Sequence, residues 1–122
     1  MKKLFITLIT ILSVSLTAMA DSYDSCVVKN GNGASVVVTV EDFTANGTVY
    51  VSIASDCDDY VNVTYEISLY HYSTGFYQCV ARDTFTVSVQ PNSNTPKKHE
   101  IKFKGFYEIA KADVSVSGAR CE

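Results

Sequence analysis

From residue 21 onward, apolar β-branched residues recur at every second position, and this alternation constrains the fold more than any other feature of the chain. Such a pattern is typical of strands with one buried face. No stretch of residues 21–122 shows a convincing helical period of 3.6 residues. The least regular segment, 104–111, is expected to form a loop or a short helical turn. The alternation predicts an all-β domain, with its clearest short strands at 35–43, 47–54, 98–104 and 113–117.

Residues 60–89 are expected to form one long β-hairpin that turns at Ser73-Thr74-Gly75. A three-residue loop favours glycine at its left-handed position, which Gly75 would occupy. In this register apolar residues oppose apolar ones on one face, polar residues oppose polar ones on the other, and only Tyr65 opposite Asp83 fits poorly. The expected pairs are Val61 with Val87, Val63 with Phe85, Ile67 with Ala81, Leu69 with Cys79, Asn62 with Thr86, Thr64 with Thr84, Glu66 with Arg82 and Tyr70 with Gln78.

Several short antiparallel strands separated by turns are typical of a sandwich or a barrel. A second hairpin turn is predicted at Ala45-Asn46-Gly47, between the strands 35–43 and 47–54. Six strands are visible, and we expect a seventh near Val27 or Tyr107. The expected architecture is a small antiparallel β-sandwich of immunoglobulin-like shape, with six to seven strands, one long hairpin and two disulfides.

The segment Tyr77-Gln78-Cys79 resembles the Tyr-x-Cys motif of immunoglobulin domains, and Ser73-Thr74-Gly75 loosely extends the likeness. The resemblance covers about seven residues. The chain contains no Trp, so the core Trp of that family has no counterpart. The hairpin register accounts for the same residues without the family, and the resemblance implies only a sandwich-like fold.

Residues 1–20 have the three-part layout of a secretory signal peptide. Lys2 and Lys3 precede the apolar stretch 4–16, and Ala18-Met19-Ala20 places small residues where a signal peptidase cleaves. The alternative is an uncleaved N-terminal anchor, although the apolar stretch is short for a membrane-spanning helix. We expect a bacterial, exported protein, periplasmic or secreted, with residues 21–122 as a single domain that does not associate with membranes after cleavage.

All four cysteines follow the predicted leader, and an even count in a short exported chain is typical of disulfides. Zinc is the competing interpretation, but zinc ligands usually occur as close pairs and these cysteines are widely spaced. Cys57 lies at the end of an expected strand whose partner begins near Ala34. Cys26 lies just upstream of that partner, beyond the flexible segment 30–33, and can therefore reach Cys57. The preferred pairing is therefore Cys26 with Cys57 and Cys79 with Cys121, among three possible patterns.

The charge of the chain argues against two classes of partner. Residues 21–122 carry eight basic and thirteen acidic side chains, a net charge of −5. An acidic chain is a poor ligand for nucleic acid or for anionic lipid. A local basic strip is interpreted as the solvated face of a strand, and it consists of Lys97, Lys98, Lys102 and Lys104.

No set of residues satisfies the requirements of a catalytic site, and we expect the protein not to be an enzyme. Neither His71 nor His99 has a nucleophile at a recognisable spacing, and no G-x-S-x-G motif occurs. The acidic segment Asp56-Cys57-Asp58-Asp59 could bind calcium weakly, but it lacks a known calcium-loop spacing and is interpreted as a turn. No metal or cofactor is expected.

The tip of the long hairpin is the candidate binding site, because loop tips are normally small and polar whereas this one is aromatic. Its residues are Tyr70, His71, Tyr72, Phe76 and Tyr77. In the expected register Tyr72 faces Phe76 and His71 faces Tyr77, so these pairs could also serve only to stabilise the hairpin.

The sequence favours a non-catalytic interaction protein of the bacterial envelope or exterior, such as a hydrolase inhibitor or an assembly accessory. Its expected partner is an unidentified protein. Two alternatives remain open. The same tyrosines could stack on sugars in a carbohydrate-binding module, or the long strands could assemble a surface polymer.

Overall fold

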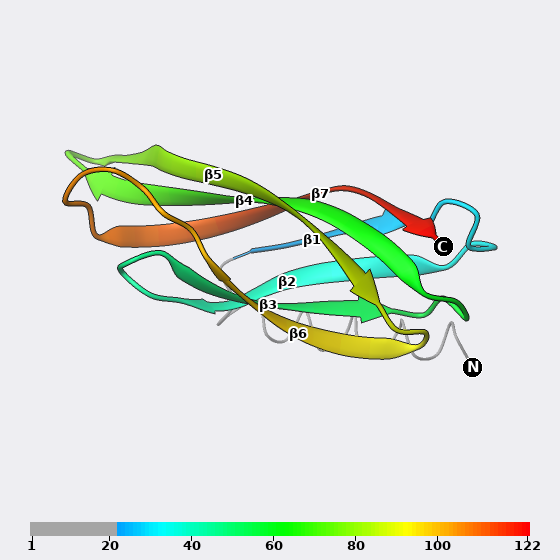
Figure 1. The fold of residues 1–122 in the computed structure, drawn as a ribbon. Coiled ribbons are helices and arrows are strands. Elements are labelled where there is room, and N and C mark those ends of the chain that lie inside the picture. Colours follow the sequence, from blue (N-terminus) through cyan, green and yellow to red (C-terminus); the bar gives the residue numbers. More distant parts are fainter. Residues whose placement is uncertain (1–21) are drawn as a thin grey trace.

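The computed structural model describes residues 22–122, so the predicted leader at 1–20 lies outside the described residues. These residues form two antiparallel sheets that lie face to face (Figure 1), with the strand orders β1-β2-β3-β6 and β5-β4-β7. The prediction of an all-β, two-sheet architecture is confirmed. The seven strands are β1 (Ser22–Val27), β2 (Ser35–Phe43), β3 (Thr48–Ser55), β4 (Val61–Ser73), β5 (Phe76–Val89), β6 (Ser93–Glu100) and β7 (Ile109–Cys121).

The strand order differs from that of an immunoglobulin domain. An immunoglobulin constant domain places its first, second, fifth and fourth strands in one sheet. Here the β2–β3 hairpin stays in one sheet and the β4–β5 hairpin stays in the other. The segment Tyr77-Gln78-Cys79 lies close to a hairpin turn, at the start of β5. The immunoglobulin likeness therefore extends to the two-sheet architecture and not to the connectivity.

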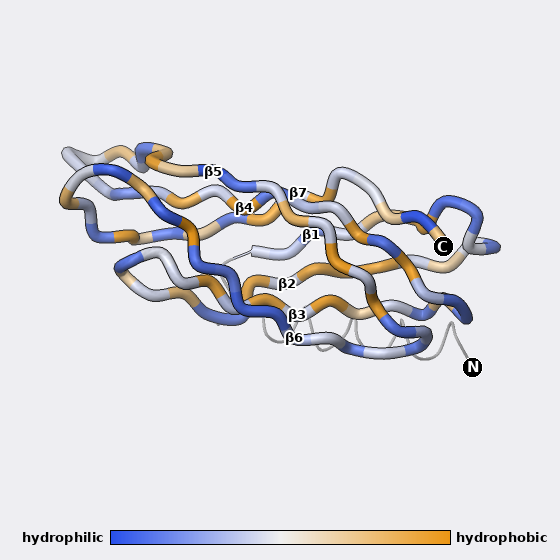
Figure 2. The backbone as a smooth tube through the Cα atoms, viewed as in Figure 1, coloured by the Kyte–Doolittle hydropathy of each residue, from blue (hydrophilic) through white to orange (hydrophobic). Residues whose placement is uncertain are grey.

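The core forms because alternate residues of the central strands point between the sheets. The β2 and β3 residues predicted to share a face are almost completely buried, and they pack against the inward-facing residues of β4. Figure 2 shows this as apolar segments along the central strands. Burial of each such aliphatic side chain contributes roughly 1.5–3 kcal/mol. The central buried set is Val36, Val38, Val40, Val49, Val51, Ile53, Val63, Tyr65, Ile67 and Leu69.

The β4–β5 hairpin is confirmed, but its predicted register is wrong. The turn contains two residues, Thr74 and Gly75, with φ angles of 50° and 88°. Between Leu69 and Tyr70 the register shifts, which leaves Val80 as an extra residue on β5. Farther from the turn each pairing is displaced by two positions, so that Tyr65 faces Phe85 and Asp83 lies opposite Ile67. A shift of two preserves the inward and outward faces.

The expected strand at 98–104 is also wrong, since β6 ends at Glu100 and residues 101–108 form a loop. Ile101 is buried, but its N–H donates to the Gly47 carbonyl at 3.0 Å as part of a loop contact. β6 itself is a polar edge strand with Pro96 and two lysines, residues that discourage further strand pairing. The strand predicted at 113–117 is present but longer than expected, since β7 spans Ile109–Cys121.

The seventh strand lies near Val27, one of the two expected positions, and it closes one side of the sandwich. Ser22 Oγ accepts a hydrogen bond from Val114 N at 3.1 Å, and Asp24 Oδ2 accepts one from Val116 N at 2.8 Å. Just after β1, Lys29 forms a parallel bridge with Arg120 of β7. The N-terminal strand thus bonds to both sheets.

All four cysteines are free, so the two expected disulfides are not formed in this structure. The Cys57 and Cys121 sulfurs lie 3.9 Å apart. Along β4, Cys79 lies opposite Tyr70 and Cys121 opposite Val61. Nine residues of strand span about 30 Å, whereas bridged cysteines have Cα atoms within about 7 Å. The expected pairing of Cys79 with Cys121 therefore does not fit the fold.

Candidate functional site

The tip of the β4–β5 hairpin extends beyond the core. Leu69 is the last fully buried residue of β4, and Tyr70 and His71 are partly exposed. Beyond them Tyr72 is 51% exposed, Phe76 74% and Tyr77 54%. Large apolar side chains become exposed here because the opposing sheet ends before the hairpin does (Figure 1).

The pairing of side chains at the tip differs by one position from the expected one. Tyr72 faces Tyr77, and His71 faces Gln78, because the turn has two residues in place of three. The rings of Tyr72 and Tyr77 meet edge to face, with centroids 5.0 Å apart and an interplanar angle of 73°. Phe76 lies opposite Ser73, so no cross-strand ring covers it.

Lys111 of β7 adds a positive charge to the outer face of the tip. Its Nζ lies 5.2 Å from the centroid of the Tyr70 ring and 5.1 Å from that of Tyr77. It also pairs with Asp113 Oδ2 at 3.4 Å. The cation and the two rings attract one another and hold the tyrosines in place.

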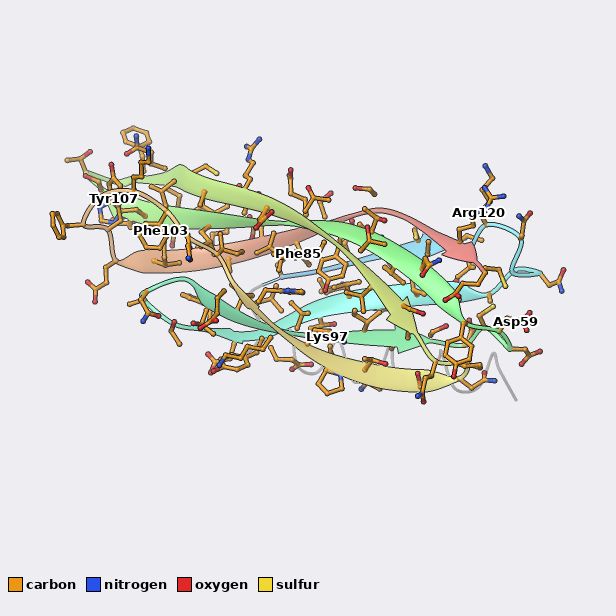
Figure 3. The ribbon with its side chains drawn as sticks, viewed as in Figure 1. Asp59, Phe85, Lys97, Phe103, Tyr107 and Arg120 are labelled. Carbon is orange, nitrogen blue, oxygen red and sulfur yellow. The ribbon has the colours of Figure 1, made fainter. Side chains whose placement is uncertain are left out.

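The loop 101–108 brings a second group of aromatic residues to the same end of the molecule. His71 Nδ1 lies 3.1 Å from the Glu108 carbonyl oxygen, and its ring lies 5.1 Å from that of Tyr107. Tyr107 also lies near Phe103, with ring centroids 6.4 Å apart, and both lie beneath the hairpin tip in Figure 3. Phe106 is fully exposed.

Gly105 sets the shape of this loop. Its φ angle is 103°, and a Cβ atom at this position would lie 2.5 Å from the Tyr107 ring. Only glycine combines this backbone conformation with so close an approach. The aromatic ring of Tyr107 therefore folds over Gly105 and reaches His71.

We call the combined surface the aromatic end. The sequence predicted its hairpin half but missed its loop half, although a glycine followed by two aromatic residues at 105–107 was the available signal. The aromatic end consists of Tyr70, His71, Tyr72, Phe76, Tyr77, Phe103, Phe106, Tyr107 and Lys111.

A groove of about 480 Å³ runs beside the aromatic end, between the free edge of β5 and the loop 101–108. Three exposed cations, Arg82, Lys102 and Lys104, line it together with Phe103 and Tyr107. The predicted basic strip is therefore divided, because Lys97 and Lys98 lie on β6 and the other two lysines face this groove.

The acidic segment 56–59 stabilises the fold through hydrogen bonds. Asp56 is buried, and its Oδ1 accepts a hydrogen bond from Ser35 N at 2.7 Å. Asp58 Oδ1 accepts one from Asn92 Nδ2 at 3.2 Å. Within residues 22–122, no group of three or more His, Cys, Asp or Glu side chains could hold a metal ion.

No known protein family matches the chain, and no curated protein matches it. Among solved structures, the chain is similar to the Salmonella enterica trimeric lipoprotein SadB, with a TM-score of 0.44 and 10% sequence identity. The match covers 95% of this chain and 73% of that chain. This similarity is too low to transfer a function. In the part of the chain that the structure describes, no helix is long and apolar enough to cross a membrane.

Proposed function

We propose that this chain is an exported, non-catalytic interaction protein of the bacterial envelope or exterior, which binds a partner protein through its aromatic end. The observation that carries the proposal is the gathering of Tyr72, Phe76, Tyr77 and Phe106, all well exposed, on two segments at one end of the sandwich. Contiguous exposed apolar surface of this kind marks interaction sites.

The aromatic side chains are suited to binding because they are already held in place. Tyr72 and Tyr77 contact each other, Lys111 contacts Tyr77, and His71 holds Tyr107. Side chains that are ordered before binding lose less conformational entropy when the complex forms. Tyrosine is also enriched among the residues that dominate protein interfaces, because it offers apolar area and a hydroxyl together.

The charges around the aromatic end define the chemistry of the partner. Lys111 belongs to it, and Arg82, Lys102 and Lys104 line the neighbouring groove, although the chain as a whole is acidic. A complementary partner has an apolar recess with carboxylates at its rim. Within this proposal, the protein would be an inhibitor of a secreted hydrolase or an assembly accessory.

Glycan binding is the competing proposal, and the ring geometry gives it less support. Sugar stacking uses an open, flat aromatic face, and the two exposed tyrosines of the hairpin, Tyr72 and Tyr77, instead meet edge to face at 73°. Self-assembly through the free edge of β5 is the other alternative. Binding to a glycan array would favour the glycan proposal over a protein partner. Rapid sedimentation of the purified protein would favour self-assembly.

The test is capture of proteins from the host envelope and culture fluid by the tagged full chain. Tyr72→Ala/Phe76→Ala removes two exposed rings of the aromatic end. Tyr23→Ala/Tyr60→Ala is the matched control, since these tyrosines are 46% and 49% exposed and lie elsewhere on the surface. Thermal melting of each variant checks that the fold is retained.

The proposal expects one protein to be captured by the wild type and the control variant, and lost with Tyr72→Ala/Phe76→Ala. Capture should weaken at high salt and in Lys102→Glu/Lys104→Glu, since both reduce attraction to acidic groups. Equal capture by the wild type and the aromatic variant would show that the aromatic end is not the binding surface.

A further inference from the structure

Cys57 and Cys121 lie in contact at the end of the sandwich opposite the aromatic end, with their sulfurs 3.9 Å apart. We propose that these two residues form the native disulfide of this protein, made by exchange with a small-molecule or protein disulfide. This pairing replaces both pairs expected from the sequence. It does not depend on the proposed function, because it requires no partner at the aromatic end.

The backbone of each cysteine is held in place by a hydrogen bond. The Cys57 carbonyl accepts a hydrogen bond from Asn92 N at 2.9 Å, and Cys121 N donates to the Lys29 carbonyl at 3.0 Å. Next to them, Glu122 N donates to the Tyr60 carbonyl at 3.0 Å, which fixes the end of β7 against the β3–β4 connection. A disulfide needs the sulfurs about 2 Å closer. The proposal requires rotation of the two side chains to supply this approach.

The other two cysteines are too far apart to bridge. Cys26 lines a groove with Asn62 and Thr64, near the start of β4. Cys79 lies opposite Tyr70, near the other end of that strand. From Thr64 to Tyr70 the strand rises about 20 Å. Cys57 with Cys121 is the pair whose sulfurs lie in contact in the structure.

The exchange proceeds in two balanced steps. Cys121 is partly exposed, whereas Cys57 is buried. The Cys121 thiolate, having lost its proton to solvent, attacks one sulfur of the oxidant disulfide, whose S–S bond breaks and releases one thiolate. The Cys57 thiolate, likewise deprotonated, then attacks the Cys121 sulfur of this mixed disulfide and releases the second thiolate. The protein loses two electrons and two protons, and the oxidant is reduced to two thiols.

The bond would join the β3–β4 connection to the last strand, across 64 positions of sequence. Closing so long a segment restricts the unfolded chain strongly and stabilises the folded state. We expect reduction to lower the melting temperature by about 10 °C or more.

The direct test is mass spectrometry of the full chain, refolded with oxidised and reduced glutathione and alkylated before digestion. Trypsin alone is insufficient, because Cys57 and Cys79 share the tryptic peptide 30–82. Chymotrypsin added after trypsin separates them by cleaving after tyrosines such as Tyr60. The expected product is a linked peptide containing Cys57 and Cys121, with alkylated Cys26 and Cys79.

Melting with and without a reductant is the second measurement. The wild type and Cys26→Ser/Cys79→Ser should both melt lower when reduced, whereas Cys57→Ser/Cys121→Ser should melt at one temperature in both conditions. A linkage of Cys57 to Cys26, or four alkylated thiols after glutathione treatment, would overturn the proposal. Loss of the reductant effect in Cys26→Ser/Cys79→Ser would overturn it as well. The mass-spectrometric result needs no variant, so a variant that fails to fold does not affect it.

Discussion

The Tyr65 hydroxyl and the His99 Nε2 lie 2.6 Å apart, and this hydrogen bond joins β4 of one sheet to β6 of the other. Phe85 covers the imidazole, with ring centroids 3.7 Å apart and an interplanar angle of 16°. Burial raises the pKa of Tyr65 to about 12. Burial also lowers the pKa of His99, and Lys97 lowers it further, although Asp83 opposes this shift. Both groups are therefore held neutral, and a neutral imidazole can accept a hydrogen bond from the Tyr65 hydroxyl at Nε2.

Acid should destabilise the domain through His99. Its pKa in the folded state lies below the ordinary value of 6.5, so the unfolded chain takes up this proton first as pH falls. The free energy of unfolding should decline from about pH 6.5 downward, through the lowered pKa of His99. Urea unfolding between pH 7.5 and 5 measures this decline, and His99→Gln should reduce it. An identical pH dependence in wild type and variant would contradict the assignment.

The faces of the strands were predictable from sequence, but the residue-by-residue register between β4 and β5 was not. Alternation assigned Val61, Val63 and Ile67 to the inner face correctly, because it depends only on whether positions are odd or even. The pairing depends on the turn and on the extra residue Val80, which shift the register by two. A turn with positive φ at a threonine is uncommon, and nothing in the local sequence marks the bulge.

Thr74→Asn should stabilise the protein by about 0.5–1 kcal/mol. Two-residue hairpin turns of this type favour Asn-Gly, and asparagine tolerates the left-handed region better than a β-branched residue. The urea midpoint measures the effect. Thr84→Asn is the matched control on exposed strand β5, where the same change should be neutral or destabilising. A lower midpoint for Thr74→Asn than for the wild type would refute the turn assignment.

Gly105→Ala should displace Tyr107 and weaken the loop half of the aromatic end, at a cost of about 1–2 kcal/mol in stability. The new methyl group would overlap the Tyr107 ring. Gly33→Ala is the matched control, since Gly33 also has a positive φ but has open space around its Cβ position. The readout is the imidazole proton shift of His71, which the Tyr107 ring influences. The chemical shift of the His71 imidazole protons should change in Gly105→Ala and stay as in the wild type in Gly33→Ala. The same chemical shift in both variants would argue against this role of Gly105.

Asp59→Asn should accelerate disulfide exchange at Cys121. Burial, the neighbouring Cys57 thiol and the Asp59 carboxylate together raise the pKa of Cys121 to about 11. Removal of the carboxylate charge lowers this pKa. At a pH below the pKa of the thiol, each unit by which the pKa falls raises the exchange rate about threefold. The rate with a chromogenic aromatic disulfide at pH 8, in Cys26→Ser/Cys79→Ser, measures the effect. Asp58→Asn is the control, and equal rates in both variants would contradict the role of Asp59.

The candidate site was predictable only where it follows from local sequence. The hairpin residues Tyr72 and Phe76 flank a recognisable turn, so their position at a tip could be inferred. The contribution of Tyr107 could not, because it depends on the loop 101–108 reaching the β2–β3 turn through Ile101 and Ile109. Ile101 and Phe103 alternate with lysines as strand residues do, although this alternation serves a loop that covers the core.

Site-specific photo-crosslinking in cells of the natural host can show whether the aromatic end contacts a partner protein. A benzophenone amino acid replaces Phe76 or Phe106 at the aromatic end, and Tyr23 or Tyr60 as controls elsewhere on the surface. We expect a discrete adduct with the same protein from positions 76 and 106 and none from 23 or 60. Adducts from position 60 alone, or no adduct from position 76, would contradict this expectation.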